Sequence, residues 1–301
     1  MRPILSCNDL ASRLGYTREQ LRLVASELDD ERRVAHYRLG VLWESGCIVR
    51  HLRVPKPHLK EIQTRIKRKV LDRLPVSDSA HGSVKGRSAK SNAQPHQGQR
   101  VVAKVDVRQF FARVKHEAVF TLFREEFGFG RDVCRLLTRL TTIDDQLPQG
   151  SPTSPSLANL VLATTVDGPL LAAATELGVR FTRYVDDITL SGDQPQPLIQ
   201  VAARLLSRQG LRIHRSAKKL KVMPRSGAQS VTGILVNHAT LLSKPKRYRD
   251  GVRAAISSLS VLPGPLRELA EQKIRGQIMY ISDIQPAAAT RLVALLEQSH
   301  R

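Results

Sequence analysis

Residues 181–191 read FTRYVDDITLS, with two apolar runs on either side of Asp186 and Asp187. The runs are short and rich in aromatic and β-branched residues, so they predict two strands joined by a tight turn. Adjacent carboxylates repel each other, and a carboxylate in apolar surroundings is costly unless a partner compensates its charge. Because Asp is also common in ordinary turns, the pair by itself leaves a purely structural turn as the alternative.

A third carboxylate, Asp106, lies in the apolar run VVAKVDV at 101–107, which predicts a buried strand. Hard cations such as Mg²⁺ prefer carboxylate oxygens and substrate phosphates as ligands. Two such ions about 4 Å apart activate an attacking hydroxyl group and stabilise a leaving pyrophosphate. The three aspartates therefore indicate a centre for two Mg²⁺ ions, for which Mn²⁺ would substitute.

Further motifs surround these aspartates in a fixed order. DVRQFF occupies 106–111, QGSPTSPSLAN occupies 149–159 and YVDD occupies 184–187. Together they resemble the palm motifs of reverse transcriptases, and the resemblance runs from about Arg50 to Ile281. It implies an α+β right-hand polymerase fold and an RNA-directed DNA polymerase, a nucleotidyltransferase that uses deoxynucleotide triphosphates.

Shorter elements narrow the family. NAQPH at 92–96 resembles the NAxxH element of retron reverse transcriptases, and VTG at 231–233 resembles their VTG triplet. HGSVKGRS at 81–88 resembles their basic finger segment, although Ser83 stands where an aromatic residue is common. The chain is thus identified as a retron-type bacterial reverse transcriptase. This implies that it copies a dedicated structured non-coding RNA into branched RNA–DNA (msDNA), in antiphage defence and with an effector protein as partner.

Two alternatives stay open at this point. One is another prokaryotic reverse transcriptase class, such as a diversity-generating, abortive-infection or group II intron-like enzyme, and the NAxxH and VTG elements argue against it. The other is a non-catalytic RNA-binding subunit that keeps a polymerase scaffold. The intact aspartates and Gln149 argue against this second alternative.

The resemblance also assigns roles to residues of the catalytic centre. It implies that Asp106 and Asp186 bridge the two metal ions and that Asp187 holds or orients them. The backbone carbonyl of Val107 would be a further metal ligand.

The resemblance also implies that Phe111, Gln149, Arg50 and Lys219 bind the incoming nucleotide. Phe111 would exclude a ribose 2′-hydroxyl group, whereas Phe110, on the opposite face, fits a core position better. Gln149 would lie against the nucleotide.

Arg50 and Lys219 match phosphate-contacting positions of the family. Arg53 competes with Arg50 for this role, and Lys218 competes with Lys219.

Five residues match retron elements outside the catalytic motifs, and we expect them to influence which RNA is used: Asn92, His96, Val231, Thr232 and Gly233. Folded RNA is recognised by hydrogen bonds and shape, which suits such residues. The alternative for Asn92 and His96 is a structural role as loop residues bonded to the backbone.

The composition agrees with a nucleic-acid partner. Among 301 residues, 48 Lys and Arg oppose 27 Asp and Glu, which gives a net charge of +21 and a pI near 10.7. A surface this basic attracts polyanions. Aromatic residues make up only 4% of the chain, so phosphate contacts should contribute more to binding than base stacking.

We expect a cytoplasmic protein with no membrane partner. The most apolar stretch, 157–174, is interrupted by Asn159, Asp167, Gly168 and Pro169, and is too broken to read as a membrane span. The three cysteines are far apart and suggest reduced thiols.

The expected organisation has four parts: a helical lead-in at 1–39, fingers at 40–100 interleaved with the palm, a palm with the catalytic centre at 101–240, and a small helical thumb at 241–301. In the lead-in, 8–30 predict two helices, and 10–26 also resemble a helix-turn-helix. Packing on the main domain is favoured there, because the second helix is not markedly basic. Strands are expected at 47–54, 211–214, 219–223 and 231–236. Helices are expected at 58–74, 115–141, 154–177, 195–209 and from Tyr248 onward, and 77–99 is expected to be an ordered finger loop.

Overall fold

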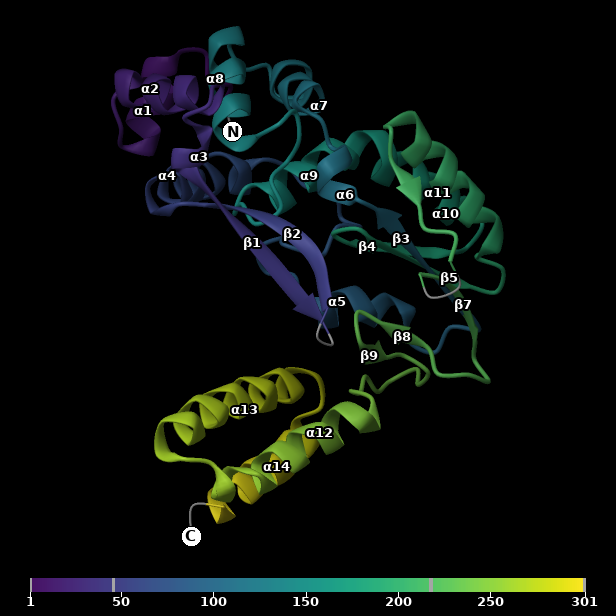
Figure 1. The fold of residues 1–301 in the computed structure, drawn as a ribbon. Helices are drawn as coiled ribbons and strands as arrows, with labels where there is room; N and C mark the ends of the chain where they lie inside the picture. Colours follow the sequence, from purple (N-terminus) through teal and green to yellow (C-terminus); the bar gives the residue numbers. More distant parts are fainter. Residues whose placement is uncertain (1, 45–46, 217–218, 300–301) are drawn as a thin grey trace.

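The computed structural model describes residues 2–44, 47–216 and 219–299, and leaves the side chains of 42–51 undescribed. Figure 1 shows N-terminal helices and a long hairpin, then a central sheet covered by helices, then a separate group of C-terminal helices. One continuous core joins the N-terminal helices to the central sheet. The C-terminal helices have a core of their own.

The N-terminal residues form the helical lead-in that the sequence predicted. A capping box of Thr17 and Gln20 begins its second helix. Leu10, Leu14 and Leu21 are buried against the neighbouring helices. Packing rather than DNA recognition explains these apolar positions. The helices of the lead-in are α1 (Cys7–Leu14), α2 (Arg18–Leu28) and α3 (Arg33–His36). Helix α4 (Pro57–Lys69), which the 3₁₀ turn η1 (Leu71–Arg73) follows, contacts α1.

A long antiparallel hairpin extends from this region. It consists of β1 (Tyr37–Glu44) and β2 (Cys47–Pro55), and its register shifts between Leu42 and Trp43. The second strand was predicted from the sequence, and the first was not. The apolar residues Leu39 and Val41 of β1 are exposed, so the described side chains at 37–41 show no alternation of buried apolar and exposed polar residues that the sequence could reveal.

Residues 77–99 form an ordered segment, as predicted. They contain α5 (Ala89–Ala93) and the 3₁₀ turn η2 (Gln94–His96). Ahead of these, the amide of Arg183 donates to the carbonyl of Ser79, and the amide of His81 donates to the carbonyl of Arg183. A Cβ added to Gly82 would lie 2.5 Å from Cγ2 of Val185, so only glycine permits this close approach. The segment therefore runs along one edge of the central sheet and meets its turn.

The central sheet has five strands in the order β4-β5-β3-β6, with β7 also paired to β3. All its pairs are antiparallel. Strand β3 is the middle of the sheet, and Val102, Ala103 and Val105 on it are fully buried. The strands are β3 (Val101–Arg108), β4 (Arg180–Tyr184), β5 (Asp187–Gly192), β6 (Arg212–Ile213) and β7 (Leu220–Pro224). The helices around the sheet are α6 (Phe110–Arg113), α7 (His116–Thr121), the π-turn η3 (Leu122–Glu126), α8 (Arg131–Thr141) and α11 (Gln196–Arg208).

The longest apolar helix of this region runs from Ser154 to Glu176. It is built from α9 (Ser154–Leu162), a π-helical turn η4 (Ala163–Asp167) and α10 (Gly168–Glu176). Among the described residues it is the one helix long and apolar enough to cross a membrane, with a mean hydropathy of 1.4, and 56% of that stretch is buried inside the protein. Its interior Asn159 and Asp167 are paired with Arg183 of the sheet, as a helix of the protein core requires.

The expected strand at 231–236 is wrong. Two short strands form a hairpin instead, β8 (Ser230–Val231) and β9 (Ile234–Leu235), with Thr232 and Gly233 in the turn. Both turn residues have positive φ, 48° and 74°, which is the backbone of a tight two-residue hairpin turn.

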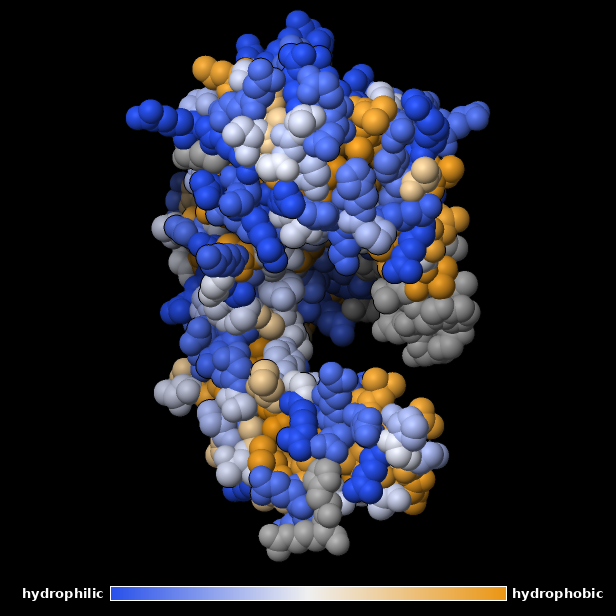
Figure 2. All heavy atoms as spheres, turned by 90° about the vertical axis from the view of Figure 1, so that its left-hand side faces the viewer, coloured by the Kyte–Doolittle hydropathy of each residue, from blue (hydrophilic) through white to orange (hydrophobic). Residues whose placement is uncertain are grey.

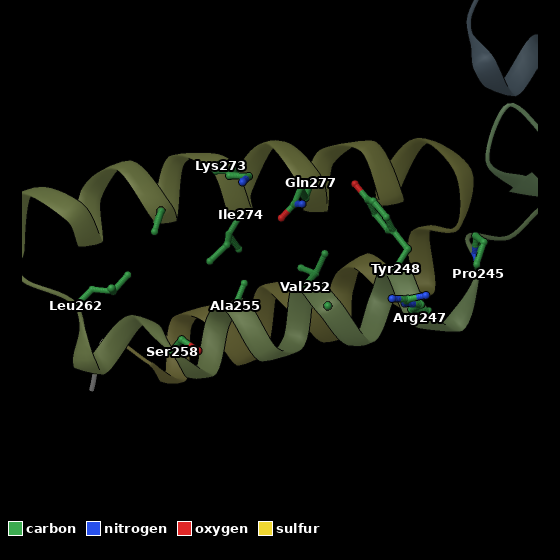
Figure 3. Close-up of a pocket in the computed structure, with 12 residues that line it drawn as sticks. Pro245, Arg247, Tyr248, Val252, Ala255, Ser258, Leu262, Lys273, Ile274 and Gln277 are labelled. Carbon is green, nitrogen blue, oxygen red and sulfur yellow. The ribbon is translucent and has the colours of Figure 1, made fainter. Parts of the chain in front are cut away.

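The C-terminal helices are α12 (Lys246–Ser257), α13 (Gly264–Ile284) and α14 (Pro286–Gln298), with the 3₁₀ turn η5 (Leu259–Val261). Val252 and Ile274 belong to their shared core and point toward each other from α12 and α13 in Figure 3. A cavity of about 750 Å³ lies between these two helices. Figure 2 shows an open space between this unit and the rest of the molecule, and apolar side chains on the unit's surface. Leu266, Leu269 and Met279 are exposed there.

Candidate active site

The turn between β4 and β5 has two residues, Val185 and Asp186, because Tyr184 pairs with Asp187 across it. Val185 has a φ of 59°, in the left-handed region that a β-branched residue avoids. Such a conformation costs about 1–3 kcal/mol and persists only where surrounding contacts hold it. The turn is therefore strained, and the structure must contain something that fixes it.

Arg183 supplies that support. Its side chain is completely buried, and its Nε and Nη2 donate to both carboxylate oxygens of Asp167 at 2.8 and 2.7 Å. Its Nη1 donates to the Asn159 side chain and to the carbonyl of Val185, each at 2.8 Å. Asn159 in turn donates to the carbonyl of Gly82 at 2.8 Å. One buried guanidinium thus ties the turn to the long helix, which also holds the 77–99 segment.

The sheet register brings the predicted aspartates together. Asp106 on β3 lies directly opposite Asp187 on β5. The amide of Val107 donates to the carbonyl of Asp186 at 3.0 Å, which holds the turn against the end of β3. Asp106 is only 8% exposed, so its charge needs compensation.

Basic side chains surround the carboxylates. Lys219 Nζ donates to Asp106 Oδ2 at 2.8 Å, and its predicted contact with phosphate stays a prediction. His214 Nε2 lies 3.4 Å from Asp106 Oδ1, and Lys104 Nζ lies 3.7 Å from Asp187 Oδ2. The competing residue Lys218 lies outside the described residues.

The donor set fits a hard divalent cation shared with a substrate. Within the described ranges, no three carboxylate, imidazole or thiol groups lie close enough to enclose a metal ion by themselves. Mg²⁺ commonly uses one or two carboxylates and completes its coordination with water and substrate phosphates. Asp106 and Asp187, paired across two strands beside Asp186, provide such a partial set. The metal-ligand roles of these residues and of the Val107 carbonyl stay predictions.

A cavity of about 490 Å³ opens beside the carboxylates, and its lining includes Asp106, Asp186, Phe111 and Gln149. Phe111 is partly exposed, and its ring contacts that of the buried Phe110 edge-on, with centroids 5.3 Å apart. Both rings border the cavity, and they differ in exposure: Phe110 is buried, as a core position requires, whereas Phe111 is partly open to the cavity. The assigned roles of Phe111 and Gln149 in nucleotide binding stay predictions.

The predicted Arg50 lies on β2, and its side chain is outside the described residues. Its competitor Arg53 is described. The Arg53 side chain lies beside a neighbouring cavity that Gln149 also lines, 3.4 Å from Asp144. Its amide donates to the carbonyl of Gln149 at 2.9 Å. The hairpin thus reaches Gln149 at the edge of the candidate site through Arg53.

The structure does not place Asn92, His96 and Val231 on a surface that RNA can reach. All three are 0% exposed. The ring nitrogens of His96 lie 2.6 Å from the hydroxyl of Ser191 and 2.8 Å from that of Thr182. Burial lowers the pKa of His96 to about 3, helped by the positive charges nearby. Direct RNA contact by these side chains is thus corrected to a structural role, because the NAxxH segment packs inward on β4 and β5.

The VTG turn occupies a junction instead. Thr232 is partly exposed, and its hydroxyl donates to the carbonyl of Ala89 in α5 at 3.1 Å. The carbonyl of Gly233 accepts from Lys244 Nζ at 2.8 Å. That ammonium group also lies 4.5 Å from the ring centroid of Tyr248 and 4.6 Å from that of Tyr280. The turn therefore links α5 in the 77–99 segment to the C-terminal helices. Thr232 and Gly233 remain candidates for RNA contact.

Sequence reasoning missed three residues that the fold brings into the site. Lys104 is two positions from Asp106 on the same strand, so strand periodicity alone signalled it. Arg183 is a basic residue within an apolar strand, which signalled a buried pair. His214 reaches the site only through the pairing of β3 with β6, and no local pattern indicates that pairing.

Comparison with known proteins defines the class. The sequence model of the family "Reverse transcriptase (RNA-dependent DNA polymerase)" matches residues 49–232, more than half of the chain. A solved structure of telomerase from Candida albicans, with a fragment of telomeric RNA, superposes with a TM-score of 0.50 at 9% identity. It covers 93% of this chain and 62% of the telomerase chain, and it shows that the two share the right-hand polymerase fold.

The particular family follows from curated relatives. The chain is 35% identical to the Retron Mx65 reverse transcriptase of Myxococcus xanthus, over 94% of this chain and 69% of that protein. It is 33% identical to the Retron Mx162 enzyme of the same organism, over 97% of this chain and 67% of that protein, and 27% identical to the Retron Ec86 enzyme of Escherichia coli, over 97% and 88%. The chain belongs to the retron reverse transcriptases and is an RNA-directed DNA polymerase.

Proposed function

We propose that this polymerase copies one dedicated, structured non-coding RNA into a branched RNA–DNA molecule, and that it does so in antiphage defence with an effector protein. The single observation that carries the chemical part is the pairing of Asp106 with Asp187 beside Asp186, at a cavity of about 490 Å³. Similarity to retron enzymes over nearly the whole chain supports the dedicated RNA. The net charge of +21 supports binding of a polyanionic template.

In this proposal, each residue of the site has a separate role in nucleotide addition. Asp106, Asp186 and Asp187 would hold two Mg²⁺ ions, or Mn²⁺ in their place, which supply activation of the primer hydroxyl and charge stabilisation. Lys219, which donates to Asp106, would neutralise charge that develops on the transferred phosphates. Phe111 at the cavity would exclude a ribose 2′-hydroxyl group and so select deoxynucleotides.

The parts of the molecule take the roles that their positions suggest. We assign fingers to 40–100, palm to 101–240 and thumb to 241–301, and the separate core of α12, α13 and α14 supports the last assignment. Cys7 and Cys134 carry free thiols, in keeping with a cytoplasmic enzyme.

The test uses the RNA encoded beside the gene and a generic primed RNA template. We expect the wild-type protein to synthesise DNA on both templates. On the RNA encoded beside the gene, the DNA should be covalently joined to the RNA through a 2′-hydroxyl group. Such a product keeps a ribonucleotide after ribonuclease treatment. Extension of the generic template without any branched product on the neighbouring RNA would contradict the retron assignment while leaving the polymerase assignment intact.

A substitution pair tests the RNA-recognition role that remains. Thr232→Val removes the turn hydroxyl that is bonded to Ala89. Thr64→Val removes a hydroxyl from the exposed face of α4 and is the matched control. We expect Thr232→Val alone to lose activity on the cognate RNA and to keep the generic reaction. Equal loss on both templates would mean that Thr232 supports the fold or the active site.

A further inference from the structure

A second cavity adjoins the active-site cavity on the side away from the β4–β5 turn. Its volume is about 580 Å³, and it lies between the end of β3, strand β6 and helix α11. Arg108 and His214 line both cavities, so the two spaces meet at these side chains. The remaining lining residues are Ala203, Ser207, Leu211, Arg212, Ile213 and Arg215.

The charge of this cavity has one sign. Arg108, Arg212 and Arg215 line it together with His214, and no carboxylate is among its described lining residues. Across the described part of the chain, none of these three arginines forms an ion pair. Arginine is nevertheless the basic partner in most of the ion pairs described there. Asp106 contacts His214 from the active-site side, and Asp186 lines the adjoining cavity. Within the second cavity itself, the described lining carries three arginines and no carboxylate.

The strand register increases this concentration. Arg108 and Arg212 lie directly opposite each other in the antiparallel pair of β3 and β6. Like charges at directly opposite positions destabilise a sheet, and opposite charges stabilise it. Both arginines are exposed at the rim of the cavity, and an anion bound between them would relieve this repulsion. Guanidinium groups bind phosphate oxygens through paired hydrogen bonds, which makes a phosphate group the suitable anion.

We propose that this cavity binds the inorganic pyrophosphate that each nucleotide addition releases. The proposal rests on the polymerase activity of the family and not on the choice of a retron RNA. Pyrophosphate forms next to Asp106, and the cavity begins at Arg108 and His214, which border that place. Its high negative charge matches three arginines better than a single backbone phosphate of a nucleic acid does. The cavity then acts as an exit site that separates the product from the carboxylates.

The first experiment measures binding by thermal unfolding, with a chelator present and with pyrophosphate as the probe. An anion that binds only the folded protein raises its unfolding temperature. We expect wild type to gain stability with pyrophosphate and Arg212→Gln to gain much less. Without pyrophosphate, Arg212→Gln should be as stable as wild type or more so, because it removes a like-charge pair. Arg204→Gln, on the exposed surface of α11 and outside the cavity lining, is the matched control and should respond like wild type.

The second experiment measures the reverse reaction on a generic primed RNA template. We expect Arg212→Gln and Arg215→Gln each to raise the pyrophosphate concentration for half-maximal rate about tenfold, the loss of one charge-assisted hydrogen bond. The KM for deoxynucleotides should stay within about twofold of wild type, and a generic template keeps the test independent of the cognate RNA.

Three results would overturn the proposal. One is an unchanged pyrophosphate constant in both variants. Another is an equal rise in the KM for deoxynucleotides, which would make the cavity part of the nucleotide triphosphate site. The last is weaker RNA binding with unchanged pyrophosphate binding, which would assign the cavity to the nucleic-acid backbone.

Discussion

The buried pair of Arg183 and Asp167 makes the sharpest prediction about stability. Both side chains are 0% exposed, and two hydrogen bonds of 2.7 and 2.8 Å join them. Asp167→Asn removes the negative charge and leaves the guanidinium buried without its partner. Breaking one side of a buried ion pair costs about 3–5 kcal/mol, so we expect the free energy of unfolding to fall by that amount.

A double substitution separates stability from catalysis. Replacing both partners of a buried pair by apolar residues of similar volume is often neutral or stabilising by about 1–4 kcal/mol. We therefore expect Arg183→Met with Asp167→Leu to recover most of the stability that Asp167→Asn loses. The double variant still lacks the hydrogen bond from Arg183 to the Val185 carbonyl, so the strained turn that carries Asp186 is no longer held. Its kcat should fall while the KM for nucleotides changes little.

The assay combines urea denaturation with primer extension on a generic template. Asp9→Asn is the matched control, because Asp9 forms an ion pair with Arg13 on the surface, where such pairs contribute about 0–1 kcal/mol. An Asp167→Asn protein with wild-type stability would refute the buried-charge argument. A double variant with wild-type kcat would refute the positioning role of Arg183.

Three further predictions concern the site and its surroundings. Asp186→Asn should abolish primer extension with Mg²⁺ or Mn²⁺ without lowering the unfolding free energy, because it also relieves like-charge repulsion; extension at the wild-type rate would exclude Asp186 from the catalytic centre. Phe111→Ala should raise the ratio of ribonucleotide to deoxynucleotide incorporation, whereas the control Phe123→Ala, fully buried and outside the cavity lining, should mainly cost about 3–5 kcal/mol of stability. An unchanged ratio in an active Phe111→Ala enzyme would exclude the gate. Unfolded His96 takes up a proton below about pH 6.5 and the folded ring only near pH 3, so acidification between these values should lower stability by up to about 1.4 kcal/mol per pH unit. Urea denaturation of wild type and His96→Gln at pH 7 and pH 5 measures this slope, and an equal slope in both would contradict it.

The catalytic centre was predictable because its signals are local. Short apolar runs on either side of two aspartates specify β4, β5 and their turn, and the buried run around Asp106 specifies β3. That Asp106 lies opposite Asp187 is a property of the strand pairing, which no local pattern in the sequence indicates.

Other features depend on contacts far apart in the chain. Strand β1 has exposed apolar residues and no clear alternation, so its pairing with β2 was invisible in the sequence. The VTG triplet read as strand because Val and Thr favour strands, whereas the positive φ of Thr232 and Gly233 makes it a turn. The match of His96 to a retron element suggested RNA contact, whereas its two hydroxyl partners, Thr182 and Ser191, come from strands about ninety residues away.

The contact of Gly82 with Val185 restricts which segments can be exchanged between related retron enzymes. The 79–82 segment and the catalytic turn are a hundred residues apart, yet the missing side chain of one makes room for the backbone of the other. Asn159 donates to the Gly82 carbonyl and accepts from Arg183, so the helix is part of the same unit. A chimera that takes its finger segment from another retron enzyme must take the turn and the helix position from the same parent. These three stretches must therefore be exchanged together, although they are far apart in the sequence.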